Sequence, residues 1–467
     1  MKRSTKINLP VKKITDIGNL LLKNKRLAAI VTLATLSFGV GLSSRSVFAA
    51  QDTPRAIVDK VWQLVNQEFV DGTFNQQDWL AVRRQLLSRN FTSKEQAYAE
   101  IRRVLKSLGD EYTRFLDPKQ SEALFNQTAG EISGIGIRMR LDSQSNQLTI
   151  MEVIANSPAL RAGLRVGDRI LAIDGRSTQG LDIKDASQLI RGRVGTPVRL
   201  RVARNGQNVV NLQLVRAAIE VPSVTYQVKQ EGDKRVGFIR LDSFTARSSE
   251  QTRRAIQNLT NQRVDSFVLD LRGNPGGLLY SSIEIAQMFM NEGTIVKTLD
   301  RRGMSIHARA NQRALTDLPL AVLIDNGSAS ASEILAGALQ DNKRAIVIGS
   351  PSFGKALVQS VYRLADGSSV AITTSRYYTP RGRDINQKGI IPDVRIDISE
   401  AQMRQIAANP DWRGSQLDPI YTKAIAILSN QDFAQSQLIQ GVGSREWEKV
   451  SVILKEKLHY MNTGSRE

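Results

Sequence analysis

The chain has no cysteine and only two histidines, His307 and His459, among its 467 residues. The absence of cysteine excludes disulfides, thiolate zinc sites, iron–sulfur clusters and a cysteine nucleophile. Two histidines cannot build a multi-histidine metal site, and they leave room for at most one catalytic triad with a histidine base. We therefore expect neither a metal nor a cofactor. The length is sufficient for about two to four domains.

Acidic residues are also scarce, because 45 Asp and Glu stand against 64 Lys and Arg and leave a formal net charge of +19. Residues 1–49 carry nine of the cations and a single acidic residue. The other cations are scattered, without the aromatic residues or motifs typical of nucleic-acid binding. The charge therefore favours a solvated basic surface first, attraction to an anionic membrane second and nucleic acid last.

The first fifty residues have the pattern of a secretory signal. A basic stretch gives way to an apolar run of roughly 16 residues over 27–42, and small residues before Ala50 fit a cleavage site. We expect residues 1–49 to be removed after Ala49 and the protein to be exported, to a periplasm or a thylakoid lumen. The alternative is an uncleaved anchor, although the run is short for a hydrocarbon core of about 30 Å.

The rest of the chain divides into four segments. Residues 50–118 repeat apolar positions at helical spacing and predict a helical module. Residues 119–217 predict a compact module of short strands between glycine-containing turns, and residues 218–400 predict an α/β core. Residues 401–467 are polar and predict helices that pack back on the core. The expected fold class is therefore multidomain α+β.

The elements of the two central modules can be placed from the sequence. In the strand-rich module we expect strands at 134–139, 148–154, 169–173 and 198–203, and a helix at 183–190. In the α/β core we expect buried strands at 236–241, 266–271, 320–324 and 345–349, and helices at 249–260, 280–291 and 331–341.

The strand-rich module resembles a PDZ domain. The resemblance rests on Asn156-Ser-Pro-Ala159, on Ala162-Gly-Leu-Arg-Val-Gly-Asp-Arg-Ile-Leu-Ala-Ile-Asp-Gly175 and on a glycine-containing loop before them. The glycines of that loop leave backbone N–H groups bare. Such groups can hold the carboxylate of a peptide's C-terminus, while an adjacent sheet edge accepts the peptide as an extra strand. The loop residues are Ser133, Gly134, Ile135, Gly136 and Ile137.

A serine-rich segment joins an expected strand to an expected helix. The strand at 320–324 runs into Asp325-Asn-Gly-Ser-Ala-Ser-Ala-Ser-Glu333, whose small side chains allow a sharp turn. A serine at this point lies where unpaired N–H groups and the positive end of the helix favour an oxyanion. The structural alternative is a helix cap, since Ser-x-x-Glu is a capping box.

Two further segments could complete an active site. Lys355 lies in Ser352-Phe-Gly-Lys-Ala-Leu-Val-Gln359. A desolvated lysine can be neutral near working pH and can act as the base for a serine, although most lysines are solvated surface groups. The segment Asp270-Leu-Arg-Gly-Asn-Pro-Gly-Gly277 ends a strand in a turn whose N–H groups could bind an oxyanion. It lacks the residue order of a phosphate-binding loop.

Together these segments resemble peptidase family S41, the carboxyl-terminal processing or tail-specific proteases. The resemblance extends over 110–118 and 389–393, and thus over nearly all of the chain after the signal. It implies a serine protease core of the crotonase-like or ClpP-like α/β type. In that family a serine and a lysine 25 residues apart form a catalytic dyad, and Ser330 and Lys355 have this spacing.

The resemblance implies roles for further residues. Gln359, four residues after the lysine, would orient it. The N–H of Ala331, with a glycine of the Gly276–Gly277 pair, would form the oxyanion hole. Ser328 and Ser332 are alternatives to the implied nucleophile that physical reasoning from the sequence does not separate from it.

The implied activity is that of a serine endopeptidase that captures the free C-terminus of a protein through its PDZ domain and cleaves near that end. Arg191 would report the capture to the catalytic site. Expected partners are proteins with an unstructured C-terminus. An adaptor or activator and peripheral membrane association stay open, and no nucleic acid is expected. Two other functions remain as alternatives: a latent PDZ scaffold that binds C-termini without cutting them, and a basic periplasmic protein that binds nucleic acid or a membrane surface. Within the protease interpretation, His307 as the base of a Ser-His-Asp triad is the alternative to Lys355.

Overall fold

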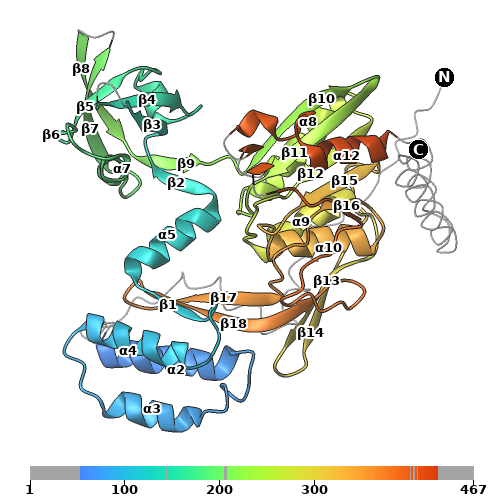
Figure 1. Cartoon of the computed structure of the whole chain (residues 1–467). Coiled ribbons are helices and arrows are strands. Elements are labelled where there is room, and N and C mark those ends of the chain that lie inside the picture. Colours follow the sequence, from blue (N-terminus) through green and yellow to red (C-terminus); the bar gives the residue numbers. More distant parts are fainter. Residues whose placement is uncertain are drawn as a thin grey trace, which may run out of the picture. The chain divides into compact units, whose positions relative to one another are not determined.

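The computed structural model describes residues 53–142, 146–204, 208–399, 401–402, 405–406 and 409–429 (Figure 1). The expected signal over 1–49 and most of the expected C-terminal segment over 401–467 lie outside the described residues, and both stay predictions. Among the described helices, none is both long and apolar enough to cross a membrane.

Three helices form the N-terminal module: α2 (Pro54–Glu68), α3 (Trp79–Ser88) and α4 (Lys94–Lys106). The side chains of Thr53, Asp78 and Ser93 each accept a hydrogen bond from a backbone N–H of the helix that follows. These bonds satisfy donors that a helix leaves unpaired at its start. The hydrophobic core of the module includes Val370 and Ile372, which belong to strand β18 (Ser369–Tyr378). The helices therefore pack directly on this strand.

The second module is a small antiparallel sheet flanked by a helix. The sheet order is β3-β4-β5-β7-β8, with β6 paired to β5, and α7 contacts β3 and β5. A separate ribbon pairs β2 with β9 and brings the two ends of the module together. The elements, preceded by α5 (Pro118–Ala129), are β2 (Glu131–Gly134), β3 (Ile137–Leu141), β4 (Leu148–Val153), α6 (Pro158–Arg161), β5 (Arg169–Ile173), β6 (Arg176–Ser177), α7 (Ile183–Ile190), β7 (Pro197–Arg204), β8 (Asn208–Val215) and β9 (Ala217–Glu220).

The third module is built on a mostly parallel six-stranded sheet of order β10-β11-β12-β15-β16-β19. All neighbours are parallel except β10 and β11. The strands are β10 (Val224–Glu231), β11 (Lys234–Leu241), β12 (Ser266–Asp270), β15 (Leu320–Ile324), β16 (Ile346–Gly349) and β19 (Val394–Arg395). The helical elements are α8 (Ser248–Asn261), α9 (Leu279–Phe289), α10 (Ala331–Asp341), the 3-10 helix η1 (Pro410–Trp412) and α12 (Pro419–Leu428).

Both faces of this parallel sheet are covered by helices (Figure 1). Phe267 and Leu269 of β12 belong to the core that includes residues of α8, α9 and α10. Val268, between them, belongs to a second core with Tyr421 of α12. A strand buried on both faces needs apolar residues at nearly every position. This is why 266–270 and 320–324 are almost unbroken apolar runs.

A second sheet links the N-terminal module to the α/β core. Its order is β1-β18-β13-β14, and β17 pairs with β18 from Ser369 to Arg376. β13 pairs with β14 as an antiparallel hairpin. The strands are β1 (Arg114–Leu116), β13 (Thr294–Asp300), β14 (Ser305–Arg309), β17 (Leu357–Arg363) and β18 (Ser369–Tyr378).

A buried ion-pair network closes the turn after β12. Arg272 hydrogen-bonds both oxygens of Asp270 and both oxygens of Asp418, at 2.6–2.9 Å. The three side chains are at most 4% exposed. Burial alone would raise the pKa of Asp270, but the charge and hydrogen bonds of Arg272 hold that pKa below its usual value. Asp418 also caps α12, so the network ties this helix to the turn.

Arg272→Met should lower the free energy of unfolding by about 3–5 kcal/mol, because Asp270 and Asp418 would become buried charges without a partner. Urea unfolding followed by circular dichroism measures the loss. Arg395→Met is the matched control, since the Arg395–Asp397 pair is 63% exposed on both sides and its loss should change stability by less than about 1 kcal/mol. Equal small losses in the two variants would contradict this account of the network.

Candidate active site

The site lies where the carboxyl ends of three neighbouring parallel strands meet. β12 leads into the turn 271–277, β15 into the segment 325–330 and β16 into the segment 350–355. In open α/β sheets, ligands bind at this edge. The three segments that the sequence singles out, far apart along the chain, therefore follow adjacent strands.

Ser330 stands at the start of α10 in a strained backbone conformation. Its φ is +54° and its ψ is −111°, a combination that residues with a side chain rarely adopt. Strain of this kind costs about 1–3 kcal/mol and persists only where the surrounding structure imposes it. A side-chain atom added to Gly276 would come within 2.9 Å of Ser330 Cβ and 3.0 Å of Ala331 N. The glycine turn therefore lies directly against the serine.

Burial separates Ser330 from the two other serines of its segment. The Ser328 hydroxyl donates to the Leu271 carbonyl at 2.8 Å, and the Ser332 hydroxyl donates to the Asn274 carbonyl at 2.9 Å. Both side chains are fully buried, whereas Ser330 is partly exposed. Of the three serines, Ser330 is the one that a substrate can reach.

One buried carboxylate connects Ser330 to the lysine segment. Glu333 is 0% exposed, and one of its oxygens accepts hydrogen bonds from the N–H groups of Ser330, at 2.7 Å, and Lys355, at 3.0 Å. Its other oxygen accepts from the Gly354 N–H and from the Ser352 hydroxyl, both at 2.6 Å. The carboxylate therefore holds the backbones of Ser330 and Lys355 at one point.

Tyr377, also buried, bridges the same two residues. Its hydroxyl hydrogen-bonds the carbonyl of Ser330 at 3.1 Å and the carbonyl of Lys355. Burial, followed by the negative charge of Glu333, raises the pKa of Tyr377 well above its usual value. The hydroxyl therefore keeps its proton and stays a donor to these carbonyls.

The two glycines of the turn differ in whether their backbone N–H group already has a hydrogen-bond acceptor. Gly276 and Gly277 have φ values of +98° and +143°, which favour glycine. The Gly276 N–H donates to Asn274 Oδ1 at 2.9 Å. Among the described residues, no acceptor is found for the N–H groups of Gly277 or Ala331. These two groups, and not that of Gly276, are therefore available to an oxyanion.

Lys355 is partly buried against the N-terminal module. Its Nζ lies 4.3 Å from the centroid of the Tyr112 ring. Burial, followed by the charge of Arg114, lowers the pKa of the Lys355 ammonium, while Asp110 and Glu333 oppose this shift. The lysine is therefore easier to deprotonate than a solvated one, as the proposed role of a base requires.

Gln359 lies on β17 and takes another partner. Its amide nitrogen donates to the Thr373 hydroxyl at 3.3 Å, and within the described part of the chain no hydrogen bond joins its side chain to Lys355. The register between β17 and β18 shifts between Val358 and Gln359. An orienting contact from Gln359 to the lysine therefore stays a prediction.

The loop predicted to hold a carboxylate connects β2 to β3. Ser133 and Gly134 end β2, Ile135 is buried at 1% exposure, and Ile137 begins β3. Gly136 has a φ of +84°, and a side chain at this position would collide with the residue packed against it. Glycine at this turn is therefore a steric requirement.

Arg191 lies beside this loop. It is exposed at the end of α7, and the Ser133 hydroxyl donates to the carbonyl of the next residue, Gly192. The loop and the arginine segment are therefore in direct contact through the side chain of Ser133.

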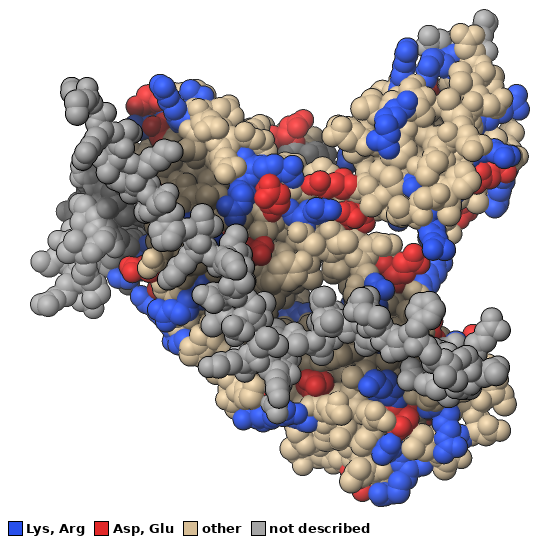
Figure 2. All heavy atoms as spheres, turned by 180° about the vertical axis from the view of Figure 1, so that it is seen from behind, with Lys and Arg blue, Asp and Glu red and all other residues tan. Residues whose placement is uncertain are grey.

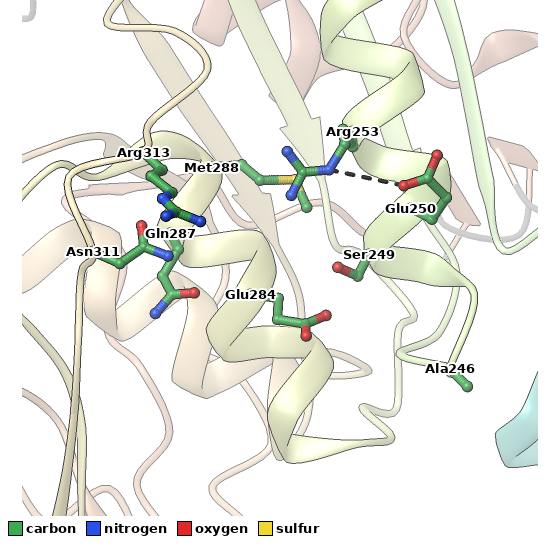
Figure 3. Close-up of a pocket in the computed structure, with 9 residues that line it drawn as sticks. All are labelled: Ala246, Ser249, Glu250, Arg253, Glu284, Gln287, Met288, Asn311 and Arg313. Carbon is green, nitrogen blue, oxygen red and sulfur yellow. Dashed lines mark ion pairs between the residues drawn. The ribbon is translucent and has the colours of Figure 1, made fainter. Parts of the chain in front are cut away.

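A pocket of about 430 Å³ lies apart from these residues, between α8 and α9 (Figure 3). Its lining is largely polar and includes the Glu250–Arg253 ion pair at 3.8 Å and Glu284. No residue predicted for the active site lines it.

The alternative base, His307, is exposed on β14, opposite Lys297 of β13. It has no hydrogen bond to Ser330 in the described structure.

The face of the molecule seen in Figure 2 carries charges of both signs. On the face seen in Figure 2, Lys and Arg are scattered among acidic and uncharged residues. Within the described ranges, no group of three or more His, Cys, Asp or Glu could hold a metal ion.

Three residues of the site have no clear signal in the sequence. Glu333 is visible there only as the end of a capping box, because its other partners lie about twenty residues away. Tyr377 and Tyr112 belong to other elements, and no local spacing connects them with Ser330 or Lys355.

Comparison with protein families agrees with this architecture. The model of peptidase family S41 matches residues 235–396, and the model of a PDZ domain matches residues 149–204. The first match spans the three strand ends, and the second runs from β4 to β7 and leaves out β3 and β8.

Individual relatives cover most of the chain. The carboxyl-terminal-processing protease of Synechocystis sp. is 40% identical over 368 residues, which is 78% of this chain and 86% of that protein. The chloroplastic carboxyl-terminal-processing peptidase 2 of Arabidopsis thaliana is 38% identical over 346 residues, 72% of this chain and 67% of that protein. A solved photosystem II D1 C-terminal processing protease is 34% identical, with 74% and 93% coverage and a TM-score of 0.47.

The chain therefore belongs to peptidase family S41 and carries a PDZ domain. The predicted family and the multidomain α+β fold are confirmed.

Glu333→Gln should lower the free energy of unfolding by about 1–3 kcal/mol, because the new amide nitrogen would face donors and leave them unpaired. Urea midpoints measure the loss. Glu250→Gln is the control, since it makes the same change at a carboxylate that is 60% exposed, so its loss should be smaller. A Glu333→Gln protein as stable as the wild type would contradict the four-donor arrangement.

Proposed function

We propose that this protein is a serine endopeptidase that cuts other proteins near their free C-terminus, with Ser330 as nucleophile and Lys355 as general base. The observation that carries the proposal is the shared anchoring of these two residues. The Glu333 carboxylate and the Tyr377 hydroxyl each bond the backbone of both. The strain at Ser330 and the membership of family S41 support the same assignment.

The first step is attack by the Ser330 oxygen on the substrate carbonyl carbon, while Lys355 takes the hydroxyl proton. Lys355 must be neutral for this, and its burial lowers its pKa toward that state. The carbonyl oxygen then carries negative charge, and the N–H groups of Gly277 and Ala331 donate to it. Because Ala331 begins α10, the positive end of the helix dipole also lies here and stabilises the negative charge on this oxygen.

The second half of the cycle releases both products. The Lys355 ammonium gives its proton to the leaving amine, and the peptide bond breaks to leave an ester on Ser330. Water, deprotonated by Lys355, then attacks the ester and restores the serine. In this cycle Gln359 would orient the lysine after leaving Thr373.

The PDZ domain would select the substrate. We propose that the terminal carboxylate binds the loop 133–137 and that the chain adds as a strand to β3. β3 is the terminal strand of its sheet and pairs with β4 alone among the described strands, so its other edge can accept a strand. Arg191, in the segment bonded to Ser133, would pass the capture on to the catalytic site.

The relatives of the chain, which include cyanobacterial and chloroplastic proteins, support a proposal for where it works. We propose export to a periplasm or thylakoid lumen, directed by residues 1–49. The further divisions at 118, 217 and 400 separate the helical module, the PDZ domain, the protease core and a C-terminal segment. An adaptor or activator protein and peripheral membrane association belong to the same proposal.

Cleavage of an unfolded protein with an apolar C-terminus tests the catalytic assignment. The purified protein should cut it, and Ser330→Ala should abolish cutting while leaving binding intact. Ser328→Ala and Ser332→Ala are matched controls that should lose stability but keep cutting. Binding without cutting by the wild type would favour a latent PDZ scaffold. An amidated substrate should be cut much more slowly if the carboxylate is recognised.

The pH dependence of kcat/KM tests Lys355. The value of kcat/KM should rise with pH as the lysine loses its proton. The midpoint of this rising limb should lie below the usual lysine pKa of about 10.4. Tyr112→Leu should move this limb roughly half a unit lower, because a cation–π contact stabilises the ammonium by about 0.5–1 kcal/mol. Tyr112→Phe keeps a ring over the lysine and should keep the limb in place. An unmoved limb in Tyr112→Leu would show that the contact does not bear on the base.

A further inference from the structure

The open edge of β3 is flanked by arginines on one face of the PDZ sheet. Ile137, Met139 and Leu141 pack against the core of the domain, whereas Arg138 and Arg140 are exposed. Successive side chains of a strand point to opposite faces of a sheet. The two arginines therefore line the outer side of the edge, and the apolar residues line its inner side.

The basic character of this face continues across the sheet. Register places Arg140 opposite Thr149, and Thr149 opposite Arg169 of β5. Arg199 and Arg201 of β7 alternate with buried residues and are exposed. Residues 131–217 hold 13 Lys and Arg against 7 Asp and Glu. Among the cations of this face, Arg138 and Arg140 are the ones on β3 itself and therefore lie nearest to whatever binds along it.

The carboxylates already near the two edge arginines hold them weakly. Arg138 pairs with Glu152 at 3.3 Å, and Arg140 approaches Asp142 at 3.9 Å. The arginine side chains are 76% and 58% exposed, and exposed pairs of this kind contribute little. Both arginines can therefore exchange these partners for carboxylates of a ligand.

We infer that the PDZ domain prefers C-termini with acidic residues at the second and fourth positions from the end, recognised by Arg138 and Arg140. The inference rests on the proposed function and adds the class of substrate to it. A peptide paired with β3 turns alternate side chains to the two faces. The last and third-last residues face the apolar side, so the second-last and fourth-last face the arginines.

Two peptides with a free C-terminus test the inference. They share apolar last and third-last residues and differ by Glu or Lys at the second-last and fourth-last positions. Fluorescence anisotropy measures their binding to the Ser330→Ala protein at 0.15 M salt. The Glu peptide should bind about threefold to tenfold tighter than the Lys peptide. Arg138→Glu with Arg140→Glu should reverse this order, a result that misfolding cannot produce.

Arg199→Glu with Arg201→Glu is the matched control. It makes the same change of charge on the same face, but β7 lies three strand spacings from β3, about 14 Å. This exceeds the Debye length of about 8 Å at that salt, so the preference for Glu should be retained. An equal loss of preference in both double variants would overturn the assignment to Arg138 and Arg140.

Amidated versions of both peptides separate this inference from the proposed function. If free acids bind better than amides but Glu and Lys peptides bind equally, the acidic preference is wrong and carboxylate capture stands. If acids and amides bind equally, or nothing binds, the proposed role of the PDZ loop fails as well. Sedimentation with phosphatidylglycerol vesicles tests whether a membrane is the partner of this face. The face would be assigned to a bilayer instead if both double variants lost vesicle binding equally and the protein showed no preference between the two peptides.

Discussion

The Glu333 carboxylate is the contact on which the active-site geometry depends. The parallel sheet brings the ends of β15 and β16 to the same edge, but it does not set the positions of the residues beyond them. Glu333 does so, because it accepts the N–H groups of Ser330 and Lys355 together with two donors between the lysine and β16. Tyr377 repeats the connection through the two carbonyls. The proposed nucleophile and the proposed base are thus joined through backbone groups, and these bonds do not engage their side chains.

This arrangement also explains how a strained serine is tolerated. The backbone of Ser330 costs about 1–3 kcal/mol, and several hydrogen bonds of the surrounding segments offset that cost. Gly276 allows the turn after β12 to lie against the serine, and the Arg272 network anchors that turn to α12. The neighbouring serines 328 and 332 serve as internal hydrogen-bond donors within the same packing. Scaffold and site are therefore parts of one hydrogen-bonded unit at the edge of the sheet.

The elements that the sequence predicts well are those with a local signal. The strands at 266–271 and 320–324 are apolar because both faces are buried, and the loop before β3 and the 25-residue spacing of Ser330 and Lys355 are visible as motifs. Apart from that family spacing, physical reasoning from the sequence does not choose among the three serines, because tertiary burial is what distinguishes them. The role of Glu333 and the position of Tyr112 over Lys355 depend on contacts between distant segments. Gln359 matches a motif but bonds Thr373 instead of the lysine.

In the proposed mechanism, Ser330 is a nucleophile activated by Lys355. Labelling of the folded protein with a fluorophosphonate, followed by mass spectrometry of its peptides, tests both roles at once. We expect one modified serine, Ser330, and at least a hundredfold slower labelling in a folded Lys355→Met protein, since a positioned base contributes about 10²–10⁴ in rate. Labelling of Ser328, Ser332 or another serine, or an unchanged rate in Lys355→Met, would contradict it.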